Sequence, residues 1–211
     1  MEELFTQVQN FKQWASEYFP EDRYGEWECD YPDWQCLYKA VLDFITTHQS
    51  INKWSTEHLE LVLYALARDN ECEYIATELR ECYPEILIEL AILSIKFGER
   101  DARWQLAQEL GQLQLETEKI EIILNEFAND SDEYVRRHAL MALARIKSGF
   151  TENLALKIWH QFHKNQEWSR MAVLWCLNEI NSSYFETFRL EAESDSRSYL
   201  SEYAKNMIRR V

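Results

Sequence analysis

The chain has 211 residues, of which 46% are apolar and 28% charged, so it is long enough to bury a core. Its 22 basic and 37 acidic side chains give a net charge of −15, which disfavours binding to nucleic-acid phosphates and anionic membranes. Four Gly and three Pro are too few for the tight turns of sheets and predict helices instead. We find no membrane-spanning apolar run and no secretory leader, so we expect a cytoplasmic protein.

The N-terminal part is predicted to contain two helices, over residues 4–19 and 34–48. Neither follows the repeat found in the rest of the chain. Because arrays of helical repeats need an end unit that covers the last apolar face, we predict a pair of capping helices over residues 1–54 at the end of one continuous array. An acidic and aromatic connection, residues 21–34, joins the two helices.

The remainder of the chain carries an internal period. Apolar residues stand four positions before and three or four positions after most of five mid-helix alanines, which places them on one helical face. One further apolar helix falls between successive alanine helices, as at residues 120–127 and 154–162. A period near 32 residues with two helices per unit indicates an α-solenoid over residues 55–211. The alanines are Ala76, Ala107, Ala139, Ala172 and Ala204, separated by 31, 32, 33 and 32 residues.

One segment fits a known repeat pattern. Residues 132–143 read Asp-Glu-Tyr-Val-Arg-Arg-His-Ala-Leu-Met-Ala-Leu, and this resembles the second helix of HEAT repeats, Asp-x-x-Val-Arg-x-x-Ala-x-x-Ala-Leu. Residues 100–103, 168–170 and 195–197 match more loosely. The resemblance implies an all-α fold, a right-handed α-α superhelix (HEAT-like solenoid) with an N-terminal capping helix pair. In that family the motif arginine, here Arg136, typically bonds an acidic residue of the adjacent unit.

Several helix ends are predicted from local signals. Asp130 and Glu133 have capping-box spacing, and Gly98 and Gly149 follow helix ends, where a positive φ is expected. Of five cysteines, Cys72, Cys82 and Cys176 fall in helical patterns and are expected to be small core residues. No CxxC pair is present, so we expect neither a disulfide framework nor a zinc site. We expect no metal and no cofactor.

The candidate binding site is the connection between the first two helices, where six carboxylates alternate with aromatic rings. Carboxylates pair with Arg and Lys of a partner, and Trp and Tyr supply large contact areas. The rings could instead fold back as a lid over the capping helices, and the two interpretations are compatible. A second acidic stretch, residues 69–85, extends the candidate contact. The residues are Glu21, Asp22, Tyr24, Glu26, Trp27, Glu28, Asp30, Tyr31 and Asp33 in the connection, and Glu71, Glu73, Glu78 and Glu81 in the second stretch.

The pattern predicts a binding protein, not an enzyme, because the sequence has no Gly-rich phosphate loop, no GxSxG and no Cys beside a candidate His base. In size, charge and expected fold it resembles immunity proteins of bacterial toxin–immunity pairs, including contact-dependent inhibition and other polymorphic toxins. That resemblance implies a protein that neutralises a basic, nuclease-type toxin by occluding its active site or substrate-binding surface, and that is a monomer when free. The alternatives are a generic HEAT-repeat scaffold for a regulatory partner, and a HEAT-like enzyme acting on DNA, which the net charge disfavours.

Overall fold

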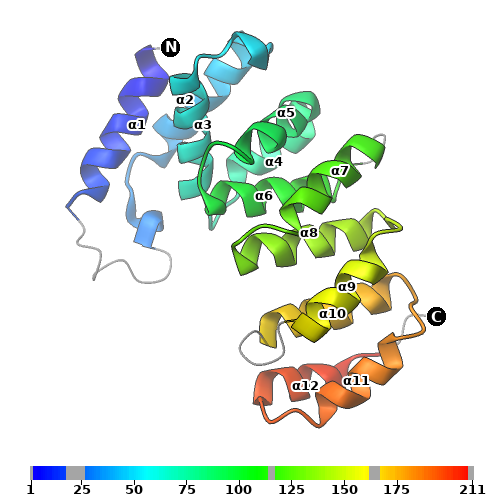
Figure 1. Ribbon diagram of the computed structural model, residues 1–211. Coiled ribbons are helices and arrows are strands. Elements are labelled where there is room, and N and C mark those ends of the chain that lie inside the picture. Colours follow the sequence, from blue (N-terminus) through cyan, green and yellow to red (C-terminus); the bar gives the residue numbers. More distant parts are fainter. Residues whose placement is uncertain (1, 18–26, 114–116, 162–166, 209–211) are drawn as a thin grey trace. The chain divides into compact units, whose positions relative to one another are not determined.

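The computed structural model describes residues 2–17, 27–113, 117–161 and 167–208 (Figure 1). Throughout these ranges the regular secondary structure is helical and no strand occurs, which confirms the all-α prediction. The helices form two compact units, residues 1–109 and residues 110–211. The predicted boundary after residue 54 falls inside the first unit.

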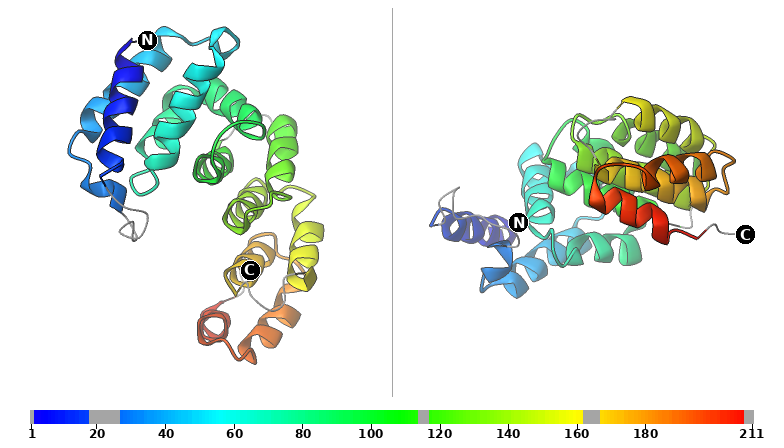
Figure 2. Two further views of the ribbon diagram at one scale, coloured as in Figure 1. Left: turned by 60° about the vertical axis from the view of Figure 1, so that its left-hand side comes forward. Right: turned by 90° about the horizontal axis from the view of Figure 1, so that it is seen from below.

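The first unit is built around the helices predicted at its N-terminus. α1 packs against α2 and α3, α2 also packs against α4, and α5 packs against α3 and α4 (Figure 2). The expected helices at residues 4–19 and 34–48 correspond to α1 and α2. The elements are α1 (Glu2–Ala15), the short 3-10 helix η2 (Trp27–Asp30), α2 (Trp34–Thr47), a second 3-10 helix η3 (Ile51–Lys53), α3 (Thr56–Arg68), α4 (Tyr74–Cys82), α5 (Pro84–Ser94) and α6 (Arg100–Leu110), whose last residue belongs to the second unit.

The second unit consists of helix pairs. α7 packs on α8, α9 on α10 and α11 on α12, while α10 packs on both α8 and α12. Large apolar side chains, among them Trp159 and Phe185, fill the space between the helices. The elements are α7 (Thr117–Phe127), α8 (Glu133–Arg145), α9 (Thr151–Gln161), α10 (Glu167–Glu179), α11 (Phe185–Glu193) and α12 (Ser198–Asn206).

The five periodic alanines are all buried, as the spacing predicts. Small residues at these positions allow neighbouring helices to approach closely. Space is also limited at Gly111, which follows Ala107 by four residues: a Cβ built there would lie 2.6 Å from Cβ of Ala142 on α8. The internal period therefore marks positions where side-chain volume is limited.

Two of the predicted helix ends are wrong in detail. The cap of α8 is Asp132, whose carboxylate accepts hydrogen bonds from the N–H groups of Tyr134 and Val135 at 2.9 and 3.3 Å, whereas Asp130 accepts from the N–H of Asp132. Gly98 has φ of 95°, as expected, but Gly149 does not have a positive φ.

After α8 the left-handed position is instead Lys147, with φ of 55°. Ser148 N–H then donates to the Leu143 carbonyl, which closes a Schellman turn without glycine. Because the turn is closed two residues earlier, Gly149 is not needed for it.

The prediction that three cysteines are core residues is wrong for two of them. Cys176 is buried in α10, but Cys72 and Cys82 are exposed. Cys72 lies in the turn between α3 and α4, and Cys82 is the last residue of α4, so neither reaches the apolar face of a helix.

The arginine of the repeat-like motif bonds locally. Arg136 donates to the carbonyl oxygens of Asp130 and Ser131, both at 2.7 Å. In the looser match, Arg170 is buried and pairs with Glu191 and Asp195 of the next helix pair, at 3.4 and 3.5 Å.

Candidate functional site

The described part of the acidic–aromatic connection, residues 27–34, packs onto α1 within the first unit. Tyr31 is 4% exposed, and its ring lies 4.7 Å from Phe11 and 5.2 Å from Trp14 of α1. Trp27 stacks on Trp14 with ring centroids 5.6 Å apart. These rings therefore cover α1 in the way expected of a lid. Glu21, Asp22, Tyr24 and Glu26 lie outside the described residues.

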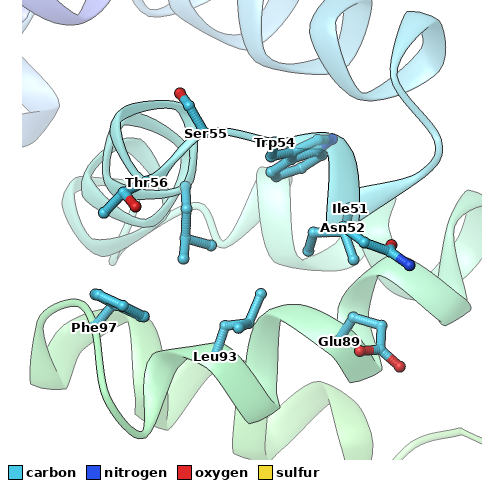
Figure 3. A pocket seen from close by; sticks show the side chains of 9 residues that line it. Ile51, Asn52, Trp54, Ser55, Thr56, Glu89, Leu93 and Phe97 are labelled. Atoms are coloured by element: carbon cyan, nitrogen blue, oxygen red, sulfur yellow. The ribbon is translucent and has the colours of Figure 1, made fainter.

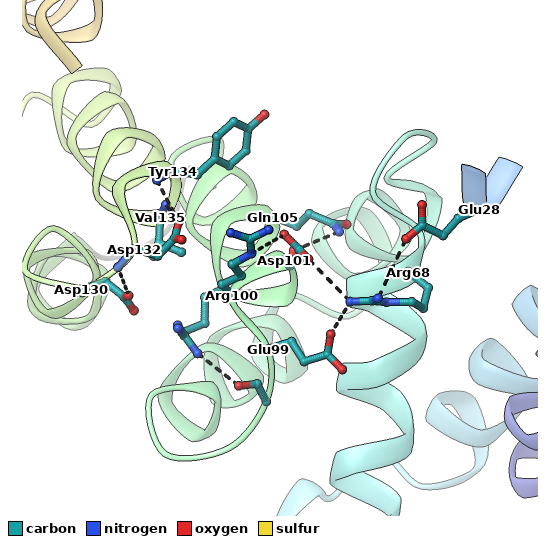
Figure 4. Close-up of polar contacts among 12 residues, drawn as sticks. Glu28, Arg68, Glu99, Arg100, Asp101, Gln105, Asp130, Asp132, Tyr134 and Val135 are labelled. Carbon is teal, nitrogen blue, oxygen red and sulfur yellow. Dashed lines mark hydrogen bonds and ion pairs between the residues drawn. The ribbon is translucent and has the colours of Figure 1, made fainter. Parts of the chain in front are cut away.

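The side chain of Glu28 is buried and forms an ion pair within the first unit. It is 4% exposed, and its carboxylate lies 3.9 Å from the guanidinium of Arg68 at the end of α3 (Figure 4). Arg68 also pairs with Glu99 and, at 3.5 Å, with Asp101 at the start of α6. One arginine thus links η2, α3 and α6. Glu28 and Tyr31 are buried in this conformation, and among the carboxylates of residues 27–34, the described part of the connection, Asp30 and Asp33 are exposed.

The second acidic stretch begins with a buried carboxylate. Asp69 accepts a hydrogen bond from the Tyr38 hydroxyl at 2.7 Å and another from the N–H of Ile75 at 2.8 Å. Burial raises the pKa of Asp69 to about 6. Burial also raises the pKa of Tyr38, and the bond to Asp69 adds to that shift. This pair fixes the turn between α3 and α4 against α2.

Glu73 stands at the same turn in a strained conformation. Its φ of 50° is unusual for a residue with a side chain, and its carboxylate accepts a hydrogen bond from Gln108. Burial raises the pKa of Glu73 to about 7, and the nearby carboxylates of Glu109 and Asp69 contribute to the shift. A cation placed near this turn would relieve repulsion among these carboxylates.

A small pocket brings the two predicted acidic segments together. We call it the junction pocket. It encloses about 80 Å³, and both segments contribute to its wall. Trp34 and Tyr38, stacked with centroids 5.2 Å apart, supply aromatic surface. The lining residues are Glu28 and Cys29 of η2, Trp34 and Tyr38 of α2, Arg68 at the end of α3, and Asp69, Asn70, Glu71 and Cys72 of the following turn.

The remaining predicted residues lie further along α4. Glu81 is exposed and pairs with Arg80 at 3.0 Å, while Glu78 is half-buried and lies near Cys82. Neither lines the junction pocket, although Tyr74, in ring contact with Tyr38 at 4.8 Å, connects the pocket to the helix that carries them. They extend the acidic surface along α4.

The net charge is concentrated in the first unit. Residues 1–109 contain 22 acidic and 9 basic side chains, a net charge of −13, whereas residues 110–211 contain 15 and 13, a net charge of −2. The first unit is therefore the main source of the chain's negative electrostatic potential.

A larger pocket lies toward the opposite end of α3 from the junction pocket. It encloses about 420 Å³ between η3, the start of α3 and the helix α5 (Figure 3). Ile51, Trp54 and Leu93 supply apolar surface, and Glu89 adds a carboxylate. Trp54 is held in place because its indole N–H donates to the His48 carbonyl at 2.7 Å. A pocket of this size accepts a large apolar side chain.

Sequence reasoning found the acidic segments but missed the residues that join them. Arg68 and Tyr38 were not predicted as site residues, yet Arg68 pairs with Glu28, and the Tyr38 ring lines the junction pocket together with Trp34, the last residue of the predicted connection. The available signal was the placement of Asp69 and Asn70 directly after an apolar helix, which marks a turn at its end.

The function of this chain is inferred from the local features described above, because no family model, curated protein or solved structure matches it. Among the described residues, no helix has the length and apolar character needed to cross a bilayer.

Proposed function

We propose that this protein binds a basic protein partner through its acidic first unit and inhibits it by covering its functional surface. The observation that carries the proposal is the concentration of charge, −13 of −15, in residues 1–109, where two separate acidic segments meet at one pocket. In the narrower form, the protein is an immunity protein and the partner is a nuclease-type toxin domain. Its phosphate-binding Arg and Lys side chains would then face the carboxylates.

Three parts of the first unit would contact the partner in different ways. Exposed carboxylates, including Asp30, Glu71 and Glu81, attract the partner and set its orientation. In the junction pocket Glu28 already pairs with Arg68, so the cationic head of a partner Lys or Arg would pair with the exposed carboxylate of Glu71 and contact the aromatic wall. The larger pocket suits an apolar anchor next to a basic residue, because Glu89 stands beside apolar walls. The fold we propose for this surface is a HEAT-like, right-handed superhelix whose first helices act as the cap.

The proposal is tested with charge-reversal variants. Asp30→Lys with Glu71→Lys should slow association with the partner and weaken binding at least about tenfold. The control, Glu118→Lys with Glu126→Lys, changes the net charge equally on exposed positions of α7 in the second unit and should have a much smaller effect. The first partner to test is the product of the gene immediately upstream, with cell survival on co-expression as the readout.

Salt and pH give an independent check. Wild-type affinity should fall roughly tenfold as the salt concentration rises from about 50 to 500 mM, because exposed charges are screened. It should also fall as the pH decreases from about 7 to 5, where Glu73 and then Asp69 gain protons. Affinity that is indifferent to salt, or equal losses in both pairs of variants, would refute charge complementarity of the first unit.

A second function has specific support. A scaffold that holds a partner on its helix pairs would use exposed aromatic residues, and α10 and α12 carry Trp168 and Tyr199, which are exposed. If Trp168→Ala abolishes binding of the same basic partner while Asp30→Lys with Glu71→Lys leaves it intact, the scaffold function replaces the inhibitor.

A further inference from the structure

The second unit presents an aromatic and methionine-rich face on α8, α10 and α12. We call it the aromatic–methionine face and define it by Met141, Trp168, Met171, Trp175, Tyr199 and Tyr203. Trp168 is 49% exposed and Tyr199 is 64% exposed, although both are large apolar side chains. The other four residues are half-buried, so the two exposed rings continue into a partly accessible apolar surface, and such a group marks an interaction surface more often than isolated residues do.

The face follows from helix geometry. Trp168, Met171 and Trp175 are spaced three and four residues apart along α10, so they share one side of that helix. Tyr199 and Tyr203 have the same relation on α12. The rings of Trp168 and Tyr199 stack across the two helices with centroids 6.0 Å apart. The side chains thus form a continuous surface over neighbouring helices.

A shallow pocket of about 140 Å³ lies in this face. Met141, Met171 and Trp175 line it together with Arg137 and Tyr203. Its volume suits one apolar side chain of a partner. Methionine adapts its shape to irregular side chains, and Trp and Tyr dominate the energetics of protein interfaces.

The cations of the face distinguish it from the first unit. The Arg137 guanidinium lies 4.5 Å from the centroid of the Tyr134 ring and pairs with Glu133 at 3.1 Å. Arg145 is exposed and lies 5.6 Å from the centroid of the Trp175 ring. The two arginines are two helical turns apart on α8, about 12 Å. Between them, burial together with the two guanidinium charges lowers the pKa of His138 to about 4.

We infer that the aromatic–methionine face binds a linear segment of a partner protein in which carboxylates adjoin apolar side chains. The apolar side chains pack on the Trp, Tyr and Met residues, and the carboxylates reach the guanidinium groups of Arg137 and Arg145. The near-neutral charge of residues 110–211 permits an acidic ligand that the first unit would repel. The inference does not rest on the proposed inhibitor function, because it concerns the other unit and a ligand of opposite charge.

The test is a differential selection from a library of random peptides of about 12 residues displayed on phage. The immobilised full chain is compared with the double variant Trp168→Ala with Tyr199→Ala. Peptides retained by the wild type and lost by the variant should contain Asp or Glu next to Leu, Phe or Trp. Basic peptides retained by both proteins report on the first unit, so the two proposals fail or succeed separately.

Selected acidic peptides are then measured by fluorescence anisotropy. The double variant and Arg145→Glu should each weaken binding at least about tenfold. Phe150→Ala is the matched control, because Phe150 is also 49% exposed but lies before α9, outside the face, and it should leave affinity unchanged. Circular dichroism verifies that all variants are folded.

Two results would overturn the inference. One is a selection in which no acidic peptide depends on Trp168 and Tyr199. The other is binding of single-stranded oligonucleotides with the same dependence on these residues and on Arg145, since stacked aromatic rings beside arginines also suit nucleic-acid bases.

Discussion

Replacing Gly111 with alanine should destabilise the second unit, because there is no room for the added Cβ atom. A Cβ at Gly111 would lie 2.6 Å from the Cβ atom and 2.7 Å from the Cα atom of Ala142 on α8. Both distances are far below van der Waals separation, and the obstructing atoms belong to backbone or to the first side-chain atom, so no rotation relieves them. Overpacking that forces a backbone shift costs about 3 kcal/mol, the upper part of the usual range.

Urea unfolding followed by tryptophan fluorescence and circular dichroism measures the effect. Gly149→Ala is the control, since a Cβ there meets nothing within 4 Å, and it should change the free energy of unfolding by less than about 0.5 kcal/mol. Adding Ala142→Gly to Gly111→Ala should restore part of the loss, because the clash with the methyl group of Ala142 disappears while the clash with the backbone of residue 142 remains. If Gly111→Ala is as stable as Gly149→Ala, the close approach of Gly111 to Ala142 is refuted.

Four further outcomes are expected. Ala139→Asp should prevent folding of the second unit, because it buries an unpaired carboxylate at a fully buried position; a folded variant by circular dichroism would contradict the repeat register. Lys147→Gly should stabilise by about 1 kcal/mol in urea unfolding, because φ of 55° suits glycine, and Lys147→Ala should not. Arg170→Ala should cost about 3 kcal/mol, because it removes a buried side chain that packs over the Trp159 ring and pairs with Glu191 and Asp195; Arg170→Met loses the same ion pairs but keeps most of the volume and should cost less, and equal costs would argue against the packing contribution. The folded state raises the pKa of Asp69 to about 6 and that of Glu73 to about 7, so it binds more protons than the unfolded state between about pH 4 and 7. The free energy of unfolding should therefore increase as the pH falls from 7 to 5. The double variant Asp69→Asn with Glu73→Gln should remove that increase.

The helical architecture could be predicted because its signals are local and repeated. Apolar residues at helical spacing placed α1 and α2 within a few residues, and the buried alanines followed from a period of about 32. Turn chemistry was less predictable. Lys147 and Glu73 adopt left-handed conformations that glycine usually occupies, and the surrounding contacts impose them.

The candidate site was predictable in composition but not in geometry. The two acidic segments were visible as runs of carboxylates, yet nothing in their spacing showed that Glu28 would be buried under Arg68, 40 residues later. Long-range pairs of this kind depend on how α3 packs against η2. The same limit applies to the aromatic–methionine face, whose members come from three helices and form no motif along the chain.

The most direct test of the acidic docking surface is hydrogen–deuterium exchange of the full chain with and without its basic partner. Bound partner should protect backbone amides in residues 27–34 and 69–82, the segments around the junction pocket, and should leave residues 110–208 at their free rates. Protection confined to α8, α10 and α12, with those two segments unchanged, would contradict the account.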